Sequence, residues 1–446
     1  MRALVVERQV HRFAAARLGA AVGGTGAALG LGPLRLVETD APRPPHPSWR
    51  RIRPRLAGIC GSDLHTVDGA SSRYFEPIVS FPFVLGHEIV ADVLEGPLAG
   101  RRAVVEPVLG CAARAIDPPC RACAEGRKGA CERIAFGEIA PGLQTGFCRD
   151  TGGGWSEELI AHDSQLHAIP DELADEDAVM VEPTACALHA ALAAGVIPGE
   201  TVVVLGSGTI GLAALAALRA HGLPGTLIAV AKHPVQREFA TELGADTVVR
   251  PSELARAVRR STGTLALERR SGGIERLAGG ADVVLDCVGT GASLSEALAV
   301  VRPGGRVVLA GMPATVKVDL APLWQREITL LGAYAYGRES VGADEEGSGR
   351  TTFALATELV AAASLGRLVS ARYALDHFEE ALRHAGGAGR RGAVKVVFDL
   401  RPAARAWRAP ARDAAVAHTV ARAEEAPDQE SAGGHAAGPQ EMEETR

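Results

Sequence analysis

The sequence predicts an α/β protein in which a β-rich half accompanies a doubly wound parallel sheet. Three observations support this fold class. Residues 34–110 alternate short apolar runs with Pro and Gly, as in an irregular β-rich domain. After residue 185 a strand–helix rhythm begins, which favours parallel strands covered by helices on both faces. The length of 446 residues exceeds what one hydrophobic core serves, so two domains are expected.

The composition is that of an ordinary globular protein. Apolar residues make up 47% and charged residues 22% of the chain, and the net charge is −6. No concentrated basic stripe indicates nucleic-acid binding. No apolar run reaches the roughly 18 residues of a membrane span, and the strand-like N-terminus lacks the pattern of a signal peptide. We therefore expect a cytoplasmic protein that contacts neither nucleic acid nor membrane.

The expected elements follow in order along the chain. Residues 14–32 are rich in Ala and Gly, and no apolar strand precedes Gly24-Thr25-Gly26, so a flexible connection is favoured over a phosphate loop. Helical spacing continues to about residue 194. The candidate strands that follow are 201–205, 227–230, 247–249, 283–286, 306–310, 329–333 and, last, 393–400. Residues 401–446 lack apolar periodicity, and we expect a largely disordered tail.

A glycine-rich turn follows the first strand of the expected parallel sheet. The apolar run 202–205 leads directly into Gly206-Ser207-Gly208-Thr209-Ile210-Gly211, and residues 212–220 continue as an apolar helix. In this setting Gly206 makes the tight turn, Gly208 lets the backbone approach a pyrophosphate, and Gly211 lets helix and strand pack closely. The free N–H groups of the helix would bind the phosphates. A glycine-rich turn without a ligand is the alternative.

The end of the second strand bears on the choice of cofactor. NAD sites usually place Asp or Glu there to bond the ribose 2′-hydroxyl. This chain has Ala231, followed by Lys232 and, further on, Arg237. Because no carboxylate repels a 2′-phosphate and either base would attract it, we favour NADP over NAD. The alternative is that these bases only begin a solvated helix.

Three motifs in the β-rich half and just after it supply metal-ligand chemistry. They are Gly58-Ile59-Cys60-Gly61-Ser62-Asp63-Leu64-His65, Gly86-His87-Glu88 and Glu182-Pro183. Thiolate, imidazole and carboxylate are donors that zinc takes in a tetrahedron, and a catalytic site keeps one position open. Each residue alone has an ordinary packing explanation, but their combination favours a metal.

Four of the eight cysteines lie close together in the sequence, at positions 111, 120, 123 and 131. In a chain without an export signal, such a cluster indicates metal binding rather than disulfides.

Taken together, these motifs resemble those of the zinc-dependent medium-chain dehydrogenase/reductase superfamily. The polyol, threonine and glucose dehydrogenases are nearest, since they use Glu-Pro where simple alcohol dehydrogenases have a third zinc-binding Cys. The resemblance covers roughly residues 1–400. It implies a GroES-like catalytic domain from residues 1–190, completed by 331–400, and a Rossmann domain from 191–330. A homodimer or homotetramer is also implied.

The resemblance implies a ligand set for a catalytic zinc. Cys60 and His87 would bind the metal, and Glu88 or Glu182 would complete the set, directly or through water. Asp63 would orient His87 from behind and tune the metal, although an Asx turn is an alternative for this residue.

It also implies a proton route. Zinc would stabilise the substrate alkoxide, and the hydride would pass to the nicotinamide. Ser62 would take the substrate proton and His65 would pass it towards solvent. Hydrogen-bonded loop packing is the alternative for both.

The cysteine cluster resembles the structural zinc lobe of the same superfamily. Cys120, Cys123 and Cys131 match the last three ligands of that lobe. The family places its first Cys three residues before the second, where this chain has Asp117. We favour Cys111 over Asp117 because four thiolates make a closed site, which makes residues 112–119 an insertion. A lobe without metal is the alternative.

The expected function is therefore reversible hydride transfer between NADP or NAD and a small alcohol or carbonyl compound, such as a secondary alcohol, polyol or sugar. One alternative is a non-catalytic zinc- and nucleotide-binding protein of the same fold. Another is a zinc-free quinone or enone reductase, which would lack Cys60 and the Gly-His-Glu motif. The sequence does not specify the substrate.

Overall fold

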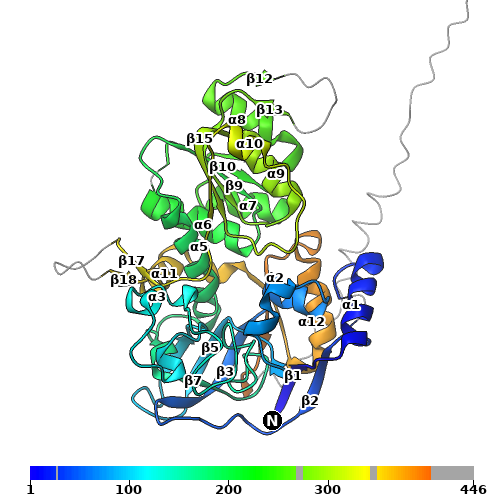
Figure 1. Cartoon of the computed structure of the whole chain (residues 1–446), viewed down its shortest axis with the longest axis vertical. Helices are drawn as coiled ribbons and strands as arrows, with labels where there is room; N and C mark the ends of the chain where they lie inside the picture. Colours follow the sequence, from blue (N-terminus) through cyan, green and yellow to red (C-terminus); the bar gives the residue numbers. More distant parts are fainter. Residues whose placement is uncertain (27–28, 223, 268–274, 342–348, 403–446) are drawn as a thin grey trace, which may run out of the picture. The chain divides into compact units, whose positions relative to one another are not determined.

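The computed structural model describes residues 1–26, 29–222, 224–267, 275–341 and 349–402 (Figure 1). Met1–Ala406 forms one compact unit, and the following statements concern that unit alone. Among its described residues, every helix is too short or too polar to cross a lipid bilayer. Residues 403–446, which make up nearly all of the predicted tail, lie outside the described residues.

A six-stranded parallel sheet forms the second half of the unit, as predicted. Its strand order is β11-β10-β9-β14-β15-β16, and every neighbouring pair is parallel. This order places the first strand at the centre, where the direction of strand addition reverses. The strands are β9 (Thr201–Leu205), β10 (Thr226–Val230), β11 (Thr247–Val249), β14 (Ala281–Asp286), β15 (Val301–Leu309) and β16 (Thr329–Gly332).

Helices cover both faces of this sheet because its strands are apolar on both sides. Val202 and Val204 pack with one group of helices, whereas Val203 and Leu205 pack with the other. The first group comprises α5 (Val181–Ala193), α6 (Thr209–Ala217), α7 (Pro234–Glu242) and α11 (Thr352–Ala363). The second comprises α8 (Leu254–Thr262) and α9 (Gly291–Val300).

The β-rich half contains two further sheets. The larger has the order β19-β20-β3-β5-β6-β8, with β7 paired to β3, and the smaller has the order β2-β1-β4. The larger comprises β3 (Trp49–Gly58), β5 (Ile89–Val93), β6 (Arg102–Val105), β7 (Leu159–His162), β8 (Leu166–Ala168), β19 (Val369–Tyr373) and β20 (Lys395–Asp399). The smaller comprises β1 (Arg2–Val6), β2 (Leu34–Glu38) and β4 (Phe83–Val84).

Short elements complete the unit. The helices are α2 (Gly61–Val67), α3 (Arg121–Ala124), α4 (Asp175–Ala178), α10 (Ala321–Gln325) and α12 (Phe378–Gly386). Two-residue strands pair as β12 (Ala266–Leu267) with β13 (Arg276–Leu277), and β17 (Arg338–Glu339) with β18 (Arg350–Thr351). The expected domain boundary at residue 330 falls inside β16. The division into two domains otherwise stays a prediction.

The expected flexible connection between the first two strands is wrong. The structure forms a helix there, α1 (Val10–Gly23), which ends where Gly24 adopts a φ of 79°. The sequence reasoning weighted the glycines of this run, whereas alanine, its commonest residue, has the highest helix propensity.

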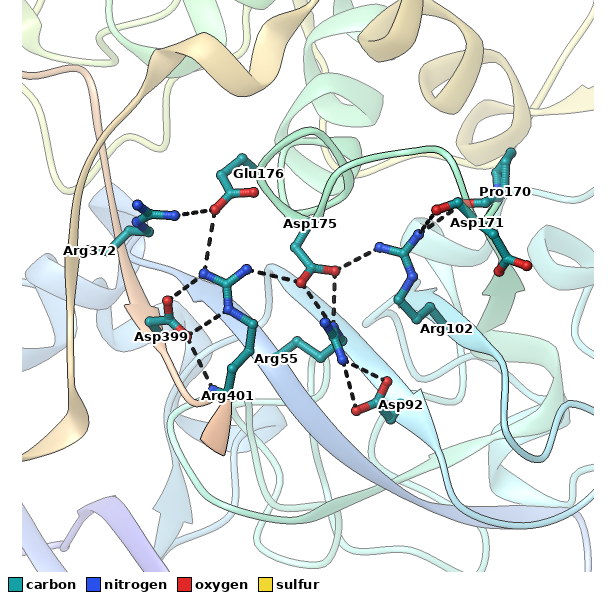
Figure 2. A network of polar contacts seen from close by, with 10 residues as sticks. All are labelled: Arg55, Asp92, Arg102, Pro170, Asp171, Asp175, Glu176, Arg372, Asp399 and Arg401. Atoms are coloured by element: carbon teal, nitrogen blue, oxygen red, sulfur yellow. Dashed lines mark hydrogen bonds and ion pairs between the residues drawn. The ribbon is translucent and has the colours of Figure 1, made fainter. Parts of the chain in front are cut away.

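An ion-pair network ties α4 to the larger sheet of the β-rich half (Figure 2). The buried carboxylate of Asp175 accepts hydrogen bonds from Arg55 of β3, Arg102 of β6 and Arg401, which follows β20. Arg55 also pairs with Asp92 at 3.2 Å. Since α4 directly precedes α5, the network fixes the start of the helical segment that carries Glu182.

Candidate active site

Two paired strands bring the predicted catalytic ligands together. β3 ends at Gly58, two residues before Cys60, and β5 begins directly after Glu88. The strands are antiparallel with Ala57 opposite Ile89, and the Gly58 N–H donates to the Glu88 carbonyl at 2.8 Å. The register therefore places the Cys60 and His87-Glu88 motifs side by side.

The side chains of these motifs form a group of donor atoms suited to zinc. One ligand atom from each of Cys60, His87 and Glu88 lies within 4.8 Å of the other two. His87 and Glu88 are buried, and Cys60 is half-buried. A soft thiolate, an imidazole and a carboxylate in a partly open group are the donors of a catalytic zinc site. The residues thus fit the ion that the sequence predicts.

Asp63 lies behind His87, as expected for an orienting carboxylate. One of its oxygens is 3.3 Å from His87 Nδ1, and the other accepts the Cys60 N–H at 2.9 Å. Asp63 is fully buried. Burial alone would lower the pKa of His87, but the neighbouring Asp63 and Cys60 together outweigh it and hold that pKa well above its usual value. This contact leaves Nε2 of His87 for a ligand.

Sequence reasoning missed Lys395, which lies beside this group. The lysine is in β20 and pairs with the carboxylate of Glu88, both side chains being 2% exposed. Its Nζ also donates to the Ile59 carbonyl at 3.2 Å. Burial lowers the pKa of Lys395, but the opposing effect of Glu88 and Cys60 is larger and leaves that pKa above its usual value. The ammonium form therefore persists. A lysine at the start of the apolar run Val396–Phe398 was the available signal.

Glu182 stands apart from the three-residue group. It is buried in the first turn of α5, but it does not belong to the group of residues whose ligand atoms all lie within 4.8 Å of one another. Burial raises its pKa to about 7, while the proximity of His87 lowers it. Cys186 lies one turn later, with its sulfur 3.6 Å from Glu182 Oε1. The structure therefore favours Glu88 over Glu182 as the third direct donor.

The two expected proton-relay residues lie on α2. Ser62 and His65 are both half-buried. Ser62 follows the Cys60 cap by two residues, and His65 lies one turn further along the helix. Burial lowers the pKa of His65, which keeps its imidazole neutral near pH 7 and able to accept a proton.

The glycine-rich turn joins β9 to α6 as predicted. Gly206 has a φ of 88°, which favours glycine. A Cβ at Gly211 would lie 1.8 Å from the Gly206 carbonyl oxygen, so the turn and helix require glycine for packing. A Cβ at Gly208 would meet nothing within 4 Å. Protein packing therefore leaves the space beside Gly208 open, which fits the approach of a pyrophosphate.

Basic side chains gather after β10, where a cofactor ribose would lie. Ala231 is buried, and its N–H donates to the Val249 carbonyl at 2.8 Å. Lys232 is exposed, and Arg237 donates to its carbonyl oxygen at 3.2 Å. Sequence reasoning missed Arg390 in the turn Ala388–Arg391, where a Cβ at Gly389 would lie 2.2 Å from the ring of His233.

The positive charges of Lys232, Arg237 and Arg390 all act on the side chain of His233. Burial lowers the pKa of His233, and the positive charges of Lys232, Arg390 and Arg237 lower it further. Among the described residues, none of the three has a carboxylate within ion-pair distance. Such a group of uncompensated cations favours an anion.

The four clustered cysteines converge in space. One sulfur atom from each of Cys111, Cys120, Cys123 and Cys131 lies within 4.8 Å of the others. The Cys131 sulfur is 3.8 Å from that of Cys111 and 3.9 Å from that of Cys120. All four thiols are free. The alternative Asp117 is exposed and lies outside the group.

Backbone N–H groups support thiolates in this cluster. The N–H groups of Cys120 and Arg133 point to the sulfurs of Cys111 and Cys131, at 3.3 and 3.4 Å. Burial raises the pKa of Cys120, but N–H donors from Cys123 and Glu132 outweigh it and lower that pKa to about 7. At Cys123 and Cys131 burial prevails and raises the pKa, that of Cys131 to about 11. Four converging sulfurs, from three buried cysteines and the half-buried Cys123, fit a structural zinc ion.

The segment between the first two cysteines contains a third residue that sequence reasoning missed. Arg114 is fully buried and donates to the carbonyls of Leu109, Phe136, Ile139, Ala140 and Gly142. The inserted residues therefore organise the loop that follows the cluster. That loop continues to Phe147, whose ring centroid is 5.9 Å from that of His87.

Comparison with known proteins gives consistent matches. A family model described as "Alcohol dehydrogenase GroES-like domain" matches residues 46–171, and one described as "Zinc-binding dehydrogenase" matches residues 209–346. L-idonate 5-dehydrogenase of Vitis vinifera is 29% identical over 78% of this chain and 87% of the relative. D-xylulose reductase A of Aspergillus oryzae is 30% identical over 64% and 74%, respectively.

A solved structure from Sinorhizobium meliloti, described as a zinc-binding dehydrogenase bound to NADP, is also similar. Its TM-score is 0.61 and its sequence is 26% identical, covering 82% of this chain and 95% of that one.

Proposed function

The chain belongs to the zinc-dependent medium-chain dehydrogenase/reductase superfamily, and from this premise we propose that it oxidises a secondary hydroxyl group of a polyol with a nicotinamide cofactor. One observation carries the proposal. The donor group of Cys60, His87 and Glu88 and the open turn at Gly208 occur in the same compact unit. The idonate and xylulose enzymes among the relatives support the polyol class.

Cys60, His87 and Glu88 would hold the catalytic zinc. When bound, the ion supplies a Lewis acid that lowers the pKa of a substrate hydroxyl, and the nicotinamide accepts the hydride. The chain supplies the remaining functions. Asp63 fixes the His87 ring through Nδ1, and Lys395 holds the Glu88 carboxylate. These contacts limit the rotamers of both ligands.

Ser62 and His65 would move the proton that leaves the substrate hydroxyl. Ser62 accepts it while releasing its own proton, and a neutral His65 takes that proton and delivers it to solvent. In the reverse direction the protonated imidazole returns a proton through Ser62 to the product oxygen. The lowered pKa of His65 keeps the neutral form available for oxidation near pH 7.

We propose NADP as the preferred cofactor. The 2′-phosphate would lie against Lys232 and Arg237, with Arg390, whose charge also acts on His233, adding a third cation. No carboxylate at position 231 would repel it. The Sinorhizobium meliloti protein, solved with NADP, supports this choice.

The cofactor assignment is tested by kcat/KM with NADP and NAD in parallel. Arg390→Ala and Lys232→Ala should each lower kcat/KM for NADP about tenfold or more, as expected for the loss of a charge-assisted contact. The rate with NAD is the internal control and should stay within twofold of wild type. Equal losses with both cofactors would contradict a 2′-phosphate site.

The activity is tested with a panel of polyols, secondary alcohols and hydroxy acids, scored by the absorbance of the reduced cofactor. Cys60→Ala should abolish oxidation of every active substrate. Cys148→Ala, which removes a buried thiol outside both donor groups, is the matched control and should retain activity. Turnover of Cys60→Ala at the wild-type rate would refute the proposal.

A further inference from the structure

The connection between β1 and β2 is far longer than the strands require. The two strands are antiparallel neighbours with Val6 opposite Leu34, a geometry that a loop of about 2–5 residues closes. Residues 7–33 stand there instead, and we call them the insertion. Its base is closed by a hydrogen bond from the Glu7 N–H to the Pro33 carbonyl at 3.2 Å. Most of the insertion is the helix α1 (Val10–Gly23).

The insertion packs against the helix that carries the proton-relay residues. A Cβ at Gly69, just after α2, would lie 2.7 Å from the Phe13 carbonyl oxygen of α1. The Phe13 ring meets Phe81 edge-on, with centroids 6.1 Å apart. A Cβ at Gly386 of α12 would lie 2.7 Å from the Thr25 side chain. The insertion therefore contacts the end of α2 and α12, beside which α1 stands in Figure 1.

One contact from the insertion reaches a buried carboxylate. Asp68 caps the C-terminus of α2 and is 6% exposed. Its Oδ1 accepts the N–H of Gly26 at 2.9 Å. Burial holds the pKa of Asp68 above its usual value, and bonds from Gly26 and Thr25 and the proximity of His65 offset part of that rise. A buried carboxylate is costly unless it is hydrogen-bonded, and the insertion supplies these bonds.

Asp68 follows His65 by three residues, at the C-cap of α2. Residues three apart in a helical turn are neighbours, and the Asp68 N–H donates to the Leu64 carbonyl at 2.9 Å, which continues the helical turn to Asp68. The Nδ1 atom of His65 is buried and has no hydrogen-bond partner among the described residues. Burial lowers the pKa of His65, and Asp68 raises it.

Other charged groups near this face are engaged elsewhere. On α2 itself, Asp63 faces His87. On α12, Arg383 pairs with Glu379 at 3.0 Å. On α1, Arg12 donates to Gln9 and to the Gly32 carbonyl. Within the part of the chain that the structure describes, Asp68 is thus the charge that acts on His65.

We propose that Asp68, held in place by the insertion, is a positioning residue that stabilises the imidazolium of His65 during proton transfer. The inference rests on the proposed function. In oxidation His65 gains the proton that Ser62 releases and then gives it to water, so no other group changes its proton count. The Asp68 carboxylate stays ionised and lowers the energy of the charged imidazole, as a buried carboxylate beside a catalytic base does.

The test is the pH profile of kcat/KM for oxidation. In wild type the rate rises with pH as His65 loses its proton. Asp68→Asn should move the midpoint of that rise to lower pH by about one unit, because the neutral amide no longer favours the imidazolium. Asp68→Glu should keep a midpoint near that of wild type even if its maximal rate falls. Asp40→Asn, an exposed carboxylate, should change nothing.

A merely structural role gives a different result. Asp68→Asn would then lower the rate equally at every pH, with the midpoint unchanged, and this outcome overturns the proposal. In a His65→Ala background, Asp68→Asn should produce no further shift, whereas a shift there would also overturn it. Failure of the proposed function is distinguishable, because wild type itself would then oxidise no alcohol in the panel.

Discussion

The buried carboxylate of Asp175 permits a quantitative test of the network that anchors α4 (Figure 2). Asp175→Asn keeps the size of the side chain but removes the charge that Arg55, Arg102 and Arg401 share, at distances of 2.9, 2.8 and 3.1 Å. The three guanidinium groups would then face an amide that accepts through one oxygen only.

The loss of unfolding free energy in Asp175→Asn can be estimated from the burial of the ion pairs. Removing one partner from a buried ion pair costs about 3–5 kcal/mol. The arginines keep 18–29% of their side-chain exposure, so solvent screens part of the loss and we expect about 3 kcal/mol. With an unfolding entropy of about 2.1 cal/mol/K per residue, a cooperative unit of about 400 residues would lose about 3–4 °C in Tm.

The assay is thermal unfolding at pH 7, with Asp171→Asn as a matched control. Arg102 contacts Asp171 only through its backbone carbonyl, at 2.7 Å, so this second variant should unfold within about 1 °C of wild type. Burial raises the pKa of Asp175, but the opposing effect of its arginine partners is larger, so that pKa lies below its usual value. Its contribution is therefore full above the unfolded pKa and is lost as the pH falls through the folded one. An Asp175→Asn protein as stable as the control would refute the reasoning.

Three other predictions follow from close contacts. Gly58→Ala would place a methyl group 1.8 Å from Glu88 Oε2, so kcat should fall about 10–100-fold; an unchanged kcat would mean that the Glu88–Lys395 pair moves freely. Cys120→Ser should remove about one zinc ion per chain, measured by elemental analysis, and a full zinc content would exclude Cys120 as a ligand. Arg114→Met leaves buried carbonyls without donors and should lower the free energy of unfolding by about 3–5 kcal/mol, measured in urea; a loss below about 1 kcal/mol would contradict that role.

Much of the fold and of the donor groups could be predicted because local patterns fix them. The strand at 201–205 and the turn at Gly206 obey short-range rules of apolar runs and glycine geometry. Cys60 and His87 converge because β3 pairs with β5. This pairing could be expected because the motifs at the ends of both strands resemble those of a known family. The family and fold class are confirmed.

The features that were missed depend on contacts between distant residues. Lys395 lies in β20 and meets Glu88 only because β20 pairs with β3. Arg114 has no periodic signal, and its role becomes clear only when the loop carbonyls converge on it. The helix α1 was missed for another reason, since the glycines of residues 14–32 were given more weight than the alanines.

The most direct test of the central claim is the zinc content of wild type and His87→Ala, measured together with polyol oxidation. We predict about two zinc ions per chain in wild type and about one in His87→Ala, with oxidation lost in the variant. A His87→Ala protein that keeps its full zinc content, or that oxidises substrate at the wild-type rate, would contradict the account.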